Sequence, residues 1–160
     1  MTRVLALGGG VVVLDQLTKA VVLSHLEPGM HVVVAPFVNL TLVMNPGLAF
    51  GLLGGVPLGW RWLVAALSLL ALAVLARVAL RVLPDGSRVD HYAIGLIFGG
   101  AVGNLIDRVR FGAVVDFVDL HAHGYHWPAF NVADSSITIG VALLALRLLV
   151  RPAVSVPEGH

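Results

Sequence analysis

The sequence predicts a mainly α-helical membrane protein with four transmembrane helices and a small β-unit between the first and second helices. Of the 160 residues, 58% are hydrophobic and only 12% are charged, whereas soluble domains carry roughly 25% charged residues. Four stretches approach the length of about 20 apolar residues that a helix needs to cross a bilayer. Between the first two stretches the apolar run gives way to β-branched and turn residues. We therefore expect a single membrane domain over residues 1–160.

The first helix is expected over residues 4–23, where only a few polar residues between Asp15 and Lys19 interrupt the apolar character. A secretory signal peptide would also place an apolar run after Arg3. However, Asp15 and Lys19 lie inside this run, and no clear cleavage site of small residues follows it. A transmembrane helix is the favoured interpretation.

The β-unit is expected over residues 31–56. Val32–Val34 and Val38–Val43 are rich in β-branched residues, and they are broken by Pro36 and the turn sequence Asn45–Gly47. A segment this irregular is too costly to place in lipid, because its backbone polar groups would lack partners there. It is therefore expected at the membrane surface.

The other three helices are expected over residues 58–83, 91–107 and 133–150. The second of the four is the cleanest apolar run, and the third is shorter and rich in glycine. The connection between the third and fourth helices contains Phe111–Leu120, which has the same β character as the unit at 31–56.

Four crossings place both termini on the same side of the membrane. Lys and Arg are commoner on that side, and the positive-inside rule then places the termini in the cytoplasm and the β-unit outside. The terminal side carries Arg3, Arg77, Arg81, Arg88, Arg147 and Arg151, and the other side carries Lys19, Arg61, Arg108 and Arg110.

This crossing pattern brings polar residues of three helices to one level near the outer interface. Ionisable residues at membrane depth cost about 2.5–3.5 kcal/mol each, and they usually face a protein interior or a wet cavity. A polar pocket below the outer surface is therefore predicted. Its candidate residues are Asp15, Lys19, Asn104, Asp107, Arg108, Asp116, Asn131 and Asp134. The sequence leaves open whether Asp15 with Lys19, and Asp107 with Arg108, are only ion pairs that join helices.

Asp116 and Asp134 have no cation beside them in the sequence. Two carboxylates that share one proton can activate water and protonate a leaving amine, because the first ionisation raises the pKa of the second. If Phe111–Leu120 is extended, Asp119 points away from Asp116. We therefore expect Asp119 to be an ordinary loop carboxylate.

Other chemistries fit the sequence less well. His121, His123 and His126 lack the helical HExxH spacing of a membrane metalloprotease and are expected to be solvated loop histidines. Ser135 and Ser136 lack a GxSxG elbow, although Lys19 as a base for a serine stays open. Cysteine is absent, which excludes disulfides and thiolate chemistry. No metal or cofactor is expected, and a net charge of +1 argues against a nucleic-acid partner.

Four motifs resemble those of lipoprotein signal peptidase, the type II signal peptidase of bacteria. They are DQLTK (Asp15–Lys19), NPGLAFG (Asn45–Gly51), GGAVGNLIDRVRFGAVVDFVD (Gly99–Asp119) and PAFNVADSSI (Pro128–Ile137). Each motif is weak alone. Together, in this order and at these intervals, they are specific and cover nearly the whole chain.

The resemblance implies an aspartyl endopeptidase of the bacterial inner membrane with an extracytoplasmic active site. Such an enzyme removes the signal peptide of diacylglyceryl-modified prolipoproteins by cutting N-terminal to the lipidated cysteine. The implied catalytic residues are Asp116 and Asp134, and the implied supporting or substrate-binding residues are Asp15, Lys19, Asn45, Gly47, Asn104, Asp107, Arg108, Asn131 and Ala133.

Within this interpretation Asn104 and Asn131 hold the two carboxylates, and Asp107 neutralises Arg108. The expected partners are lipidated prolipoproteins and membrane lipid, and the expected oligomeric state is a monomer. A small proton-coupled transporter is the alternative, but it would spread ionisable groups across the membrane depth. A structural assembly subunit would show no polar cluster at all.

Overall fold

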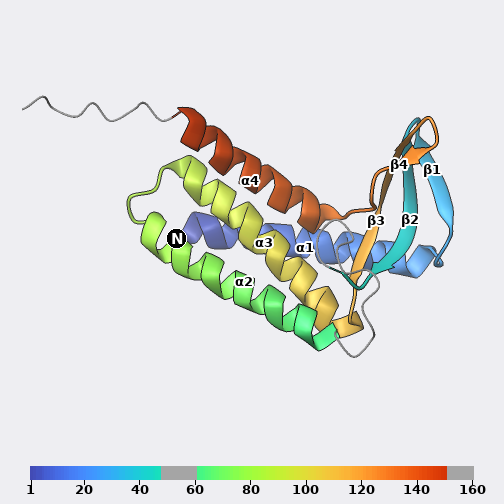
Figure 1. Cartoon of the computed structure of the whole chain (residues 1–160), viewed down its shortest axis with the longest axis horizontal. Helices are drawn as coiled ribbons and strands as arrows, with labels where there is room; N and C mark the ends of the chain where they lie inside the picture. The colour runs from blue at the N-terminus through green and yellow to red at the C-terminus, as the bar shows by residue number, and fades with distance from the viewer. Residues whose placement is uncertain (48–60, 151–160) are drawn as a thin grey trace, which may run out of the picture.

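The computed structural model describes residues 1–47 and 61–150, which form four long helices and a small sheet (Figure 1). The helices are α1 (Thr2–His25), α2 (Arg61–Val82), α3 (Arg88–Phe111) and α4 (Val132–Val150). Each is long and apolar enough to cross a membrane, and many large apolar side chains on the helices are exposed. The predicted class, a four-helix membrane protein with a small β-unit, is confirmed. The expected start of the second helix at residue 58 lies outside the described residues.

Helix α3 is the centre of the bundle and packs against the other three helices. Glycines allow this close packing. A Cβ atom on Gly99 would lie 2.6 Å from the carbonyl oxygen of Gly8 in α1, and one on Gly100 would lie 2.4 Å from the carbonyl oxygen of Ala133 in α4. In lipid, small residues of this kind let helix backbones approach each other closely. The glycine-rich sequence of α3 therefore lets α1 and the first turn of α4 both pack closely against it.

Both ends of α3 are fixed by local signals, and the helix is longer than the expected 91–107. It begins with a capping box in which Ser87 and Asp90 each accept a hydrogen bond from the other's backbone N–H. It ends at Gly112, whose φ of 73° is the left-handed conformation that favours glycine. Phe111 is therefore the last helical residue and not the start of the extended segment.

The sheet consists of β1 (His31–Ala35), β2 (Val38–Asn45), β3 (Val114–Ala122) and β4 (Tyr125–His126), in the order β1-β2-β3-β4. All neighbouring strands are antiparallel. Two strands follow α1 and two follow α3, so the β-unit is not confined to residues 31–56, of which 48–56 lie outside the described residues.

The sheet lies at the end of the bundle where α1 and α3 end and α4 begins (Figure 1). A buried apolar cluster of Val22, Leu42, Val115 and Phe117 packs the last turns of α1 against β2 and β3. At the other end of the bundle, Arg147 of α4 forms an ion pair with the buried carboxylate of Asp90 in α3. Backbone hydrogen bonds between Val118 and Phe130 hold β3, which carries Asp116, beside the segment that leads into α4.

Candidate active site

A buried ion triad joins α1 to α3 just below the sheet. Lys19 Nζ lies 2.8 Å from Asp15 Oδ2, one helical turn away, and 2.7 Å from Asp107 Oδ2. All three side chains are at most 2% exposed. The remaining donor of the ammonium group goes to Asn104 Oδ1, at 3.1 Å. The three N–H bonds of Lys19 are therefore all used, which is the condition for keeping a charge this deeply buried.

Asp15 and Asp107 also fix neighbouring backbone groups. Asp15 Oδ1 accepts a hydrogen bond from the backbone N–H of Ala133, at 3.0 Å. Asp107 Oδ2 accepts one from the backbone N–H of Val115, at 3.1 Å. The triad therefore ties α1 and α3 to the first turn of α4 and to β3, the two elements that carry Asp134 and Asp116.

Asp134 lies in the first turn of α4 within a capping box. The side chain of Asn131, which directly precedes α4, accepts a hydrogen bond from the backbone N–H of Asp134 at 2.9 Å. In return, Asp134 Oδ2 accepts one from the backbone N–H of Asn131 at 3.3 Å. The other carboxylate oxygen of Asp134 accepts from Asn104 Nδ2 at 2.8 Å. Local helix capping thus sets the direction of this carboxylate.

Asp116 lies in β3, next to β2, and is only 2% exposed. Its Oδ1 accepts a hydrogen bond from Asn131 Nδ2 at 2.7 Å, and its Oδ2 accepts one from Asn45 Nδ2 at 2.9 Å. Burial, together with the negative charge of Asp134, raises the pKa of Asp116 to about 7, although the hydrogen bonds from Asn45 and Asn131 oppose this. At neutral pH this carboxyl group therefore exists in both protonated and ionised forms.

The contacts of Arg108 differ from the expectation that Asp107 neutralises it. Asp107 pairs with Lys19 and not with Arg108, because adjacent residues on a helix do not face each other. The guanidinium of Arg108 donates instead to the carbonyl of Asn104 at 3.3 Å and to that of Gly47 at 3.0 Å. Gly47 N–H in turn donates to Asn45 Oδ1 at 3.0 Å. Arg108 therefore holds the turn after β2 close to Asp116.

The hydrogen bonds and ion pairs above connect all the residues that the sequence and the resemblance single out. The network contains Asp15, Lys19, Asn45, Gly47, Asn104, Asp107, Arg108, Asp116, Asn131, Ala133 and Asp134. The rest of the NPGLAFG motif, residues 48–51, lies outside the described part of the chain.

Asp119 and His126 also differ from expectation. Asp119 is buried in β3, and its carboxylate accepts a hydrogen bond from Asn39 at 3.0 Å and lies 2.8 Å from His126 Nδ1. Burial favours a higher pKa for Asp119, but the hydrogen bonds from His126 and Asn39 outweigh it and hold the pKa below its usual value. His126 also stacks on His121. Asp119 is thus a paired strand carboxylate, and His126 is more than a solvated loop residue.

Gln16 is the residue in this network that the sequence interpretation missed. Its amide nitrogen donates to Asp107 Oδ1 at 2.9 Å and to Asp15 Oδ2 at 3.2 Å. The sequence did indicate its position, because Gln16 precedes Lys19 by three residues and therefore lies on the same face of α1. Gln16 therefore gives the two carboxylates of the triad a further hydrogen-bond donor.

The groups that serine or metal catalysis would need are not brought together among the described residues. Ser135 and Ser136 donate to backbone carbonyls one turn earlier in α4, and the contacts of the Lys19 ammonium are to Asp15, Asp107 and Asn104. Within residues 1–47 and 61–150, no group of three or more His, Asp or Glu side chains is placed to hold a metal ion.

The chain is similar to known signal peptidases in sequence and to solved bacterial membrane enzymes in fold. Residues 7–150 match the family model of signal peptidase (SPase) II. A lipoprotein signal peptidase of Polynucleobacter necessarius subsp. necessarius is 45% identical over 145 residues, covering 90% of this chain and 87% of the relative. One from Burkholderia mallei is 45% identical over 135 residues, covering 84% and 80%.

A solved bacterial membrane enzyme has a similar fold, with a TM-score of 0.78 and 34% identity over 100% of this chain and 95% of the other. A second such structure gives a TM-score of 0.76, also at 34% identity, over 95% and 96% of the two chains.

Proposed function

The chain belongs to the signal peptidase II family, and from this premise we propose that it is an aspartyl endopeptidase in which Asp116 and Asp134 act as a pair. The observation that carries the proposal is the position of Asn131. Its side-chain amide donates to Asp116 at 2.7 Å, and its backbone N–H donates to Asp134 at 3.3 Å. A single residue therefore orients both carboxylates toward one site.

The proposed mechanism uses one proton held by the pair. The ionised carboxylate takes a proton from a water molecule, and the resulting hydroxide attacks the scissile carbonyl carbon. The protonated carboxyl group polarises the carbonyl oxygen and later transfers its proton to the leaving amine. Asn104 and Asn131 keep the carboxylates fixed, so that neither has to reorganise during the reaction.

The proposed substrate is a diacylglyceryl-modified prolipoprotein, cut on the N-terminal side of its lipidated cysteine. The pair lies in β3 and the first turn of α4, at the end of the bundle where α1 and α3 end and the sheet begins (Figure 1). In a chain with four membrane-length helices, this end would lie at the membrane interface. There the signal peptide and the acyl chains on the cysteine can stay in the bilayer while the peptide bond between them enters the site. The Asn45–Gly47 turn, held by Arg108, would contact the substrate backbone.

A direct assay tests this function. We expect the purified protein to release the signal peptide from a lipidated precursor, with a new N-terminus at the lipidated cysteine. The same precursor before lipidation should be cut poorly. Efficient cleavage of the unlipidated precursor, or cleavage at another position, would contradict the proposed specificity.

The transporter alternative predicts ionisable groups along the whole membrane depth. In α1, α3 and α4 these groups gather at the two ends, with Asp15, Asp107 and Asp134 near the sheet and the Asp90–Arg147 pair at the other end. Apart from His91, which directly follows Asp90, the three helices contain no Asp, Glu, Lys, Arg or His between these levels. A proton relay across the membrane therefore has no side chains to use in these helices.

The pH dependence of the rate is a second prediction. The pKa of Asp116, raised to about 7, means that the pair loses its last proton as the pH rises through that region. Activity should therefore fall on the alkaline side near pH 7. It should also fall on the acid side, when both carboxylates are protonated, giving a bell-shaped profile whose two pKa values belong to the pair. A rate that keeps rising above pH 8 would contradict this.

The raised pKa of Asp116 also predicts how the stability of the fold changes with pH. A carboxyl group whose pKa is higher in the folded state than in the unfolded state destabilises the fold once it ionises. The penalty is absent below the unfolded value of about 3.9 and complete above about 7. Asp116→Asn should therefore be more stable than the parent at pH 8 and close to it at pH 4. Thermal unfolding in detergent at the two pH values measures the difference.

Membrane orientation gives a further prediction. We propose that both termini are cytoplasmic and that the sheet and the pair face the extracytoplasmic side. Asp85 lies between α2 and α3, Ala122 lies at the end of β3, and both are exposed. Asp85→Cys should react with a membrane-impermeant thiol reagent only after the membrane is opened, and Ala122→Cys should react in intact cells. Labelling of both from one side would exclude four crossings.

A further inference from the structure

Gly103 lies in α3 where α1 and the first turn of α4 both meet this helix. It is buried, and a Cβ atom on it would lie 2.6 Å from Asp15 Oδ2. Real Cβ atoms essentially never come within 3.0 Å of such an atom. The same Cβ atom would lie 3.5 Å from the Cβ atom of Ala133, which is an ordinary van der Waals contact. The carboxylate of Asp15 therefore occupies the space that a side chain at position 103 would need.

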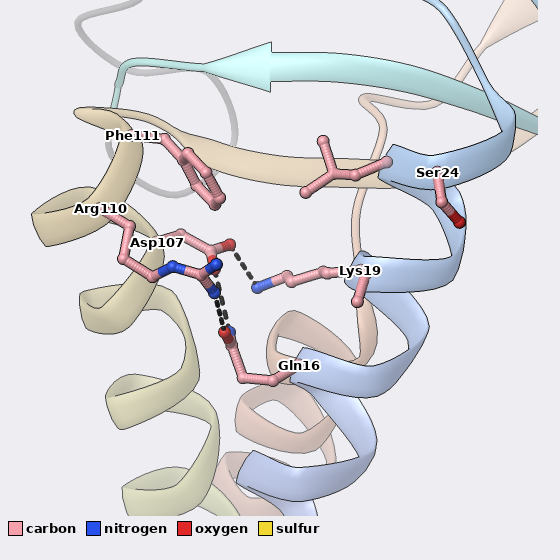
Figure 2. Close-up of a pocket in the computed structure, with 8 residues that line it drawn as sticks. Gln16, Lys19, Ser24, Asp107, Arg110 and Phe111 are labelled. Atoms are coloured by element: carbon pink, nitrogen blue, oxygen red, sulfur yellow. Dashed lines mark hydrogen bonds and ion pairs between the residues drawn. The ribbon is translucent and has the colours of Figure 1, made fainter.

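The fully buried carboxylate of Asp15 is held by donors from three residues of the described structure. Its Oδ2 contacts Lys19 Nζ at 2.8 Å and accepts from Gln16 Nε2 at 3.2 Å, and its Oδ1 accepts from the backbone N–H of Ala133 at 3.0 Å. Figure 2 shows Gln16 and Lys19 extending from α1 toward Asp107 of α3. Lys19 and Gln16 belong to the same helix as Asp15 and can follow it. The hydrogen bond from Ala133, in another helix, is therefore the contact that a displacement of Asp15 would lengthen.

The hydrogen bond from Ala133 connects Asp15 to the candidate pair. Ala133 lies in the first turn of α4, where backbone N–H groups have no acceptor within the helix. Asp15 accepts from the N–H of Ala133, and the side chain of Asn131 accepts from the N–H of Asp134. Two consecutive donors at this helix end are thus satisfied from outside the helix. Asp15 is the acceptor in α1 that fixes the turn from which the carboxylate of Asp134 projects.

We propose that Gly103 is a positioning residue for the reaction. Because it has no side chain, Asp15 can reach the backbone of Ala133 and hold the first turn of α4 in the place that presents Asp134 to Asp116. This inference rests on the proposed function, in which these two carboxylates act as a pair. A larger residue at position 103 would leave both carboxylates chemically intact, but it would separate the turn that carries Asp134 from its support in α1.

Close helix packing alone is the competing explanation for Gly103, and Gly140 provides the comparison. Gly140 lies in α4 about two turns after Ala133. A Cβ atom on Gly140 would lie 2.7 Å from the carbonyl oxygen of Ala93 in α3. This approach is almost as close as that of Gly103 to Asp15, but it involves no residue of the hydrogen-bond network around the candidate pair. Gly140→Ala therefore tests close packing without touching Asp15.

Steady-state kinetics on a lipidated precursor give the first test. Gly103→Ala should lower kcat by about 10–100-fold, because a misplacement of about 1 Å can cost about 10²-fold in rate. It should leave KM nearly unchanged, because it does not touch the Asn45–Gly47 turn. Gly140→Ala should destabilise the protein but keep the parent kcat per folded molecule. A parent kcat in Gly103→Ala, or an equal loss of kcat in Gly140→Ala, would contradict the positioning role.

Hydrogen exchange of the Ala133 amide, followed by NMR in detergent micelles, tests the same contact without any peptidase reaction. Gly103→Ala should speed this exchange about fivefold, the effect of losing one hydrogen bond. In an Asp15→Ala background the acceptor is already gone, so adding Gly103→Ala should change nothing further. An unchanged exchange rate in Gly103→Ala would overturn the positioning role and leave the proposed function standing. A parent protein that cleaves no lipidated precursor would instead overturn the function, on which the role depends.

If Gly103→Ala does not fold, the double variant decides. Asp15→Ala removes the carboxylate that the new methyl group would meet, so Asp15→Ala with Gly103→Ala should fold as well as Asp15→Ala alone. Recovery of folding in the double variant would support the contact between position 103 and Asp15. A double variant that still fails to fold, or that exchanges the Ala133 amide faster than Asp15→Ala does, would show that Gly103 acts through backbone packing. The positioning role would then be wrong.

Discussion

Asp116→Asn and Asp134→Asn are each expected to leave a folded, membrane-inserted protein that no longer releases signal peptides. Asparagine is nearly the same size as aspartate, and its carbonyl oxygen can still accept a hydrogen bond from Asn131. It cannot hold the proton that the reaction moves. General acid–base catalysis contributes roughly 10²–10⁴-fold to a rate, so a loss of at least about 10³-fold is expected for either variant. Single-turnover cleavage of a lipidated precursor in detergent measures it.

Two controls make this result specific. The double variant should be no slower than either single variant, because the two carboxylates act as a unit. Asp119→Asn makes the same chemical change three residues further along β3, where the side chain contacts Asn39 and His126 and not Asn131. It should keep much of the parent activity. If Asp119→Asn is inactive while Asp116→Asn is active, the assignment of the pair is wrong. If all three variants are active, the aspartyl mechanism fails.

The level of the polar cluster could be predicted from the sequence because it depends only on the number of crossings. Once four helices alternate in direction, Asp15, Asn104 and Asp134 must lie near the same end of the bundle, whatever the details of packing. The structure places all three in one hydrogen-bond network. Sequence alone was enough here because chain direction is a global property that a small error in helix bounds does not change.

The partners of individual charges could not be predicted in this way. Whether Asp107 faces Lys19 or Arg108 depends on the rotation of α3 about its axis. That rotation is set by backbone contacts such as those of Gly99 with Gly8 and of Gly100 with Ala133. Likewise, Asp119 meets His126 because His123 and Gly124 both have positive φ, 51° and 82°, in the tight turn that folds β4 back onto β3. Neither feature follows from hydrophobic periodicity or from residue type.

Lys19→Met is expected to cause the largest loss of stability. Lys19 is the one cation in contact with the buried carboxylates of Asp15 and Asp107 in the described structure, at 2.8 and 2.7 Å. Methionine has a similar length and would fill the space, but it leaves both carboxylates without a positive partner. Removing one member of a buried ion pair costs about 3–5 kcal/mol. The free energy of unfolding in mixed detergent–SDS micelles should fall by about this amount, and peptidase activity should fall with it because Asn104 loses its contact with Lys19.

The triple variant Asp15→Asn, Lys19→Met, Asp107→Asn separates charge from packing. It has the same methionine as the single variant, but no buried carboxylate is left in the triad. Removing one partner of a buried ion network is costly because it leaves an uncompensated charge. The triple variant leaves no such charge, so it should recover most of the free energy that Lys19→Met loses. Arg3→Met, which removes an exposed cation from the same helix, should change stability by no more than about 0.5 kcal/mol. If the triple variant is as unstable as Lys19→Met, the loss comes from the missing hydrogen bond to Asn104 and from altered packing. The triad would then hold α1 against α3 by shape, and its charges would be incidental to the stability of the bundle.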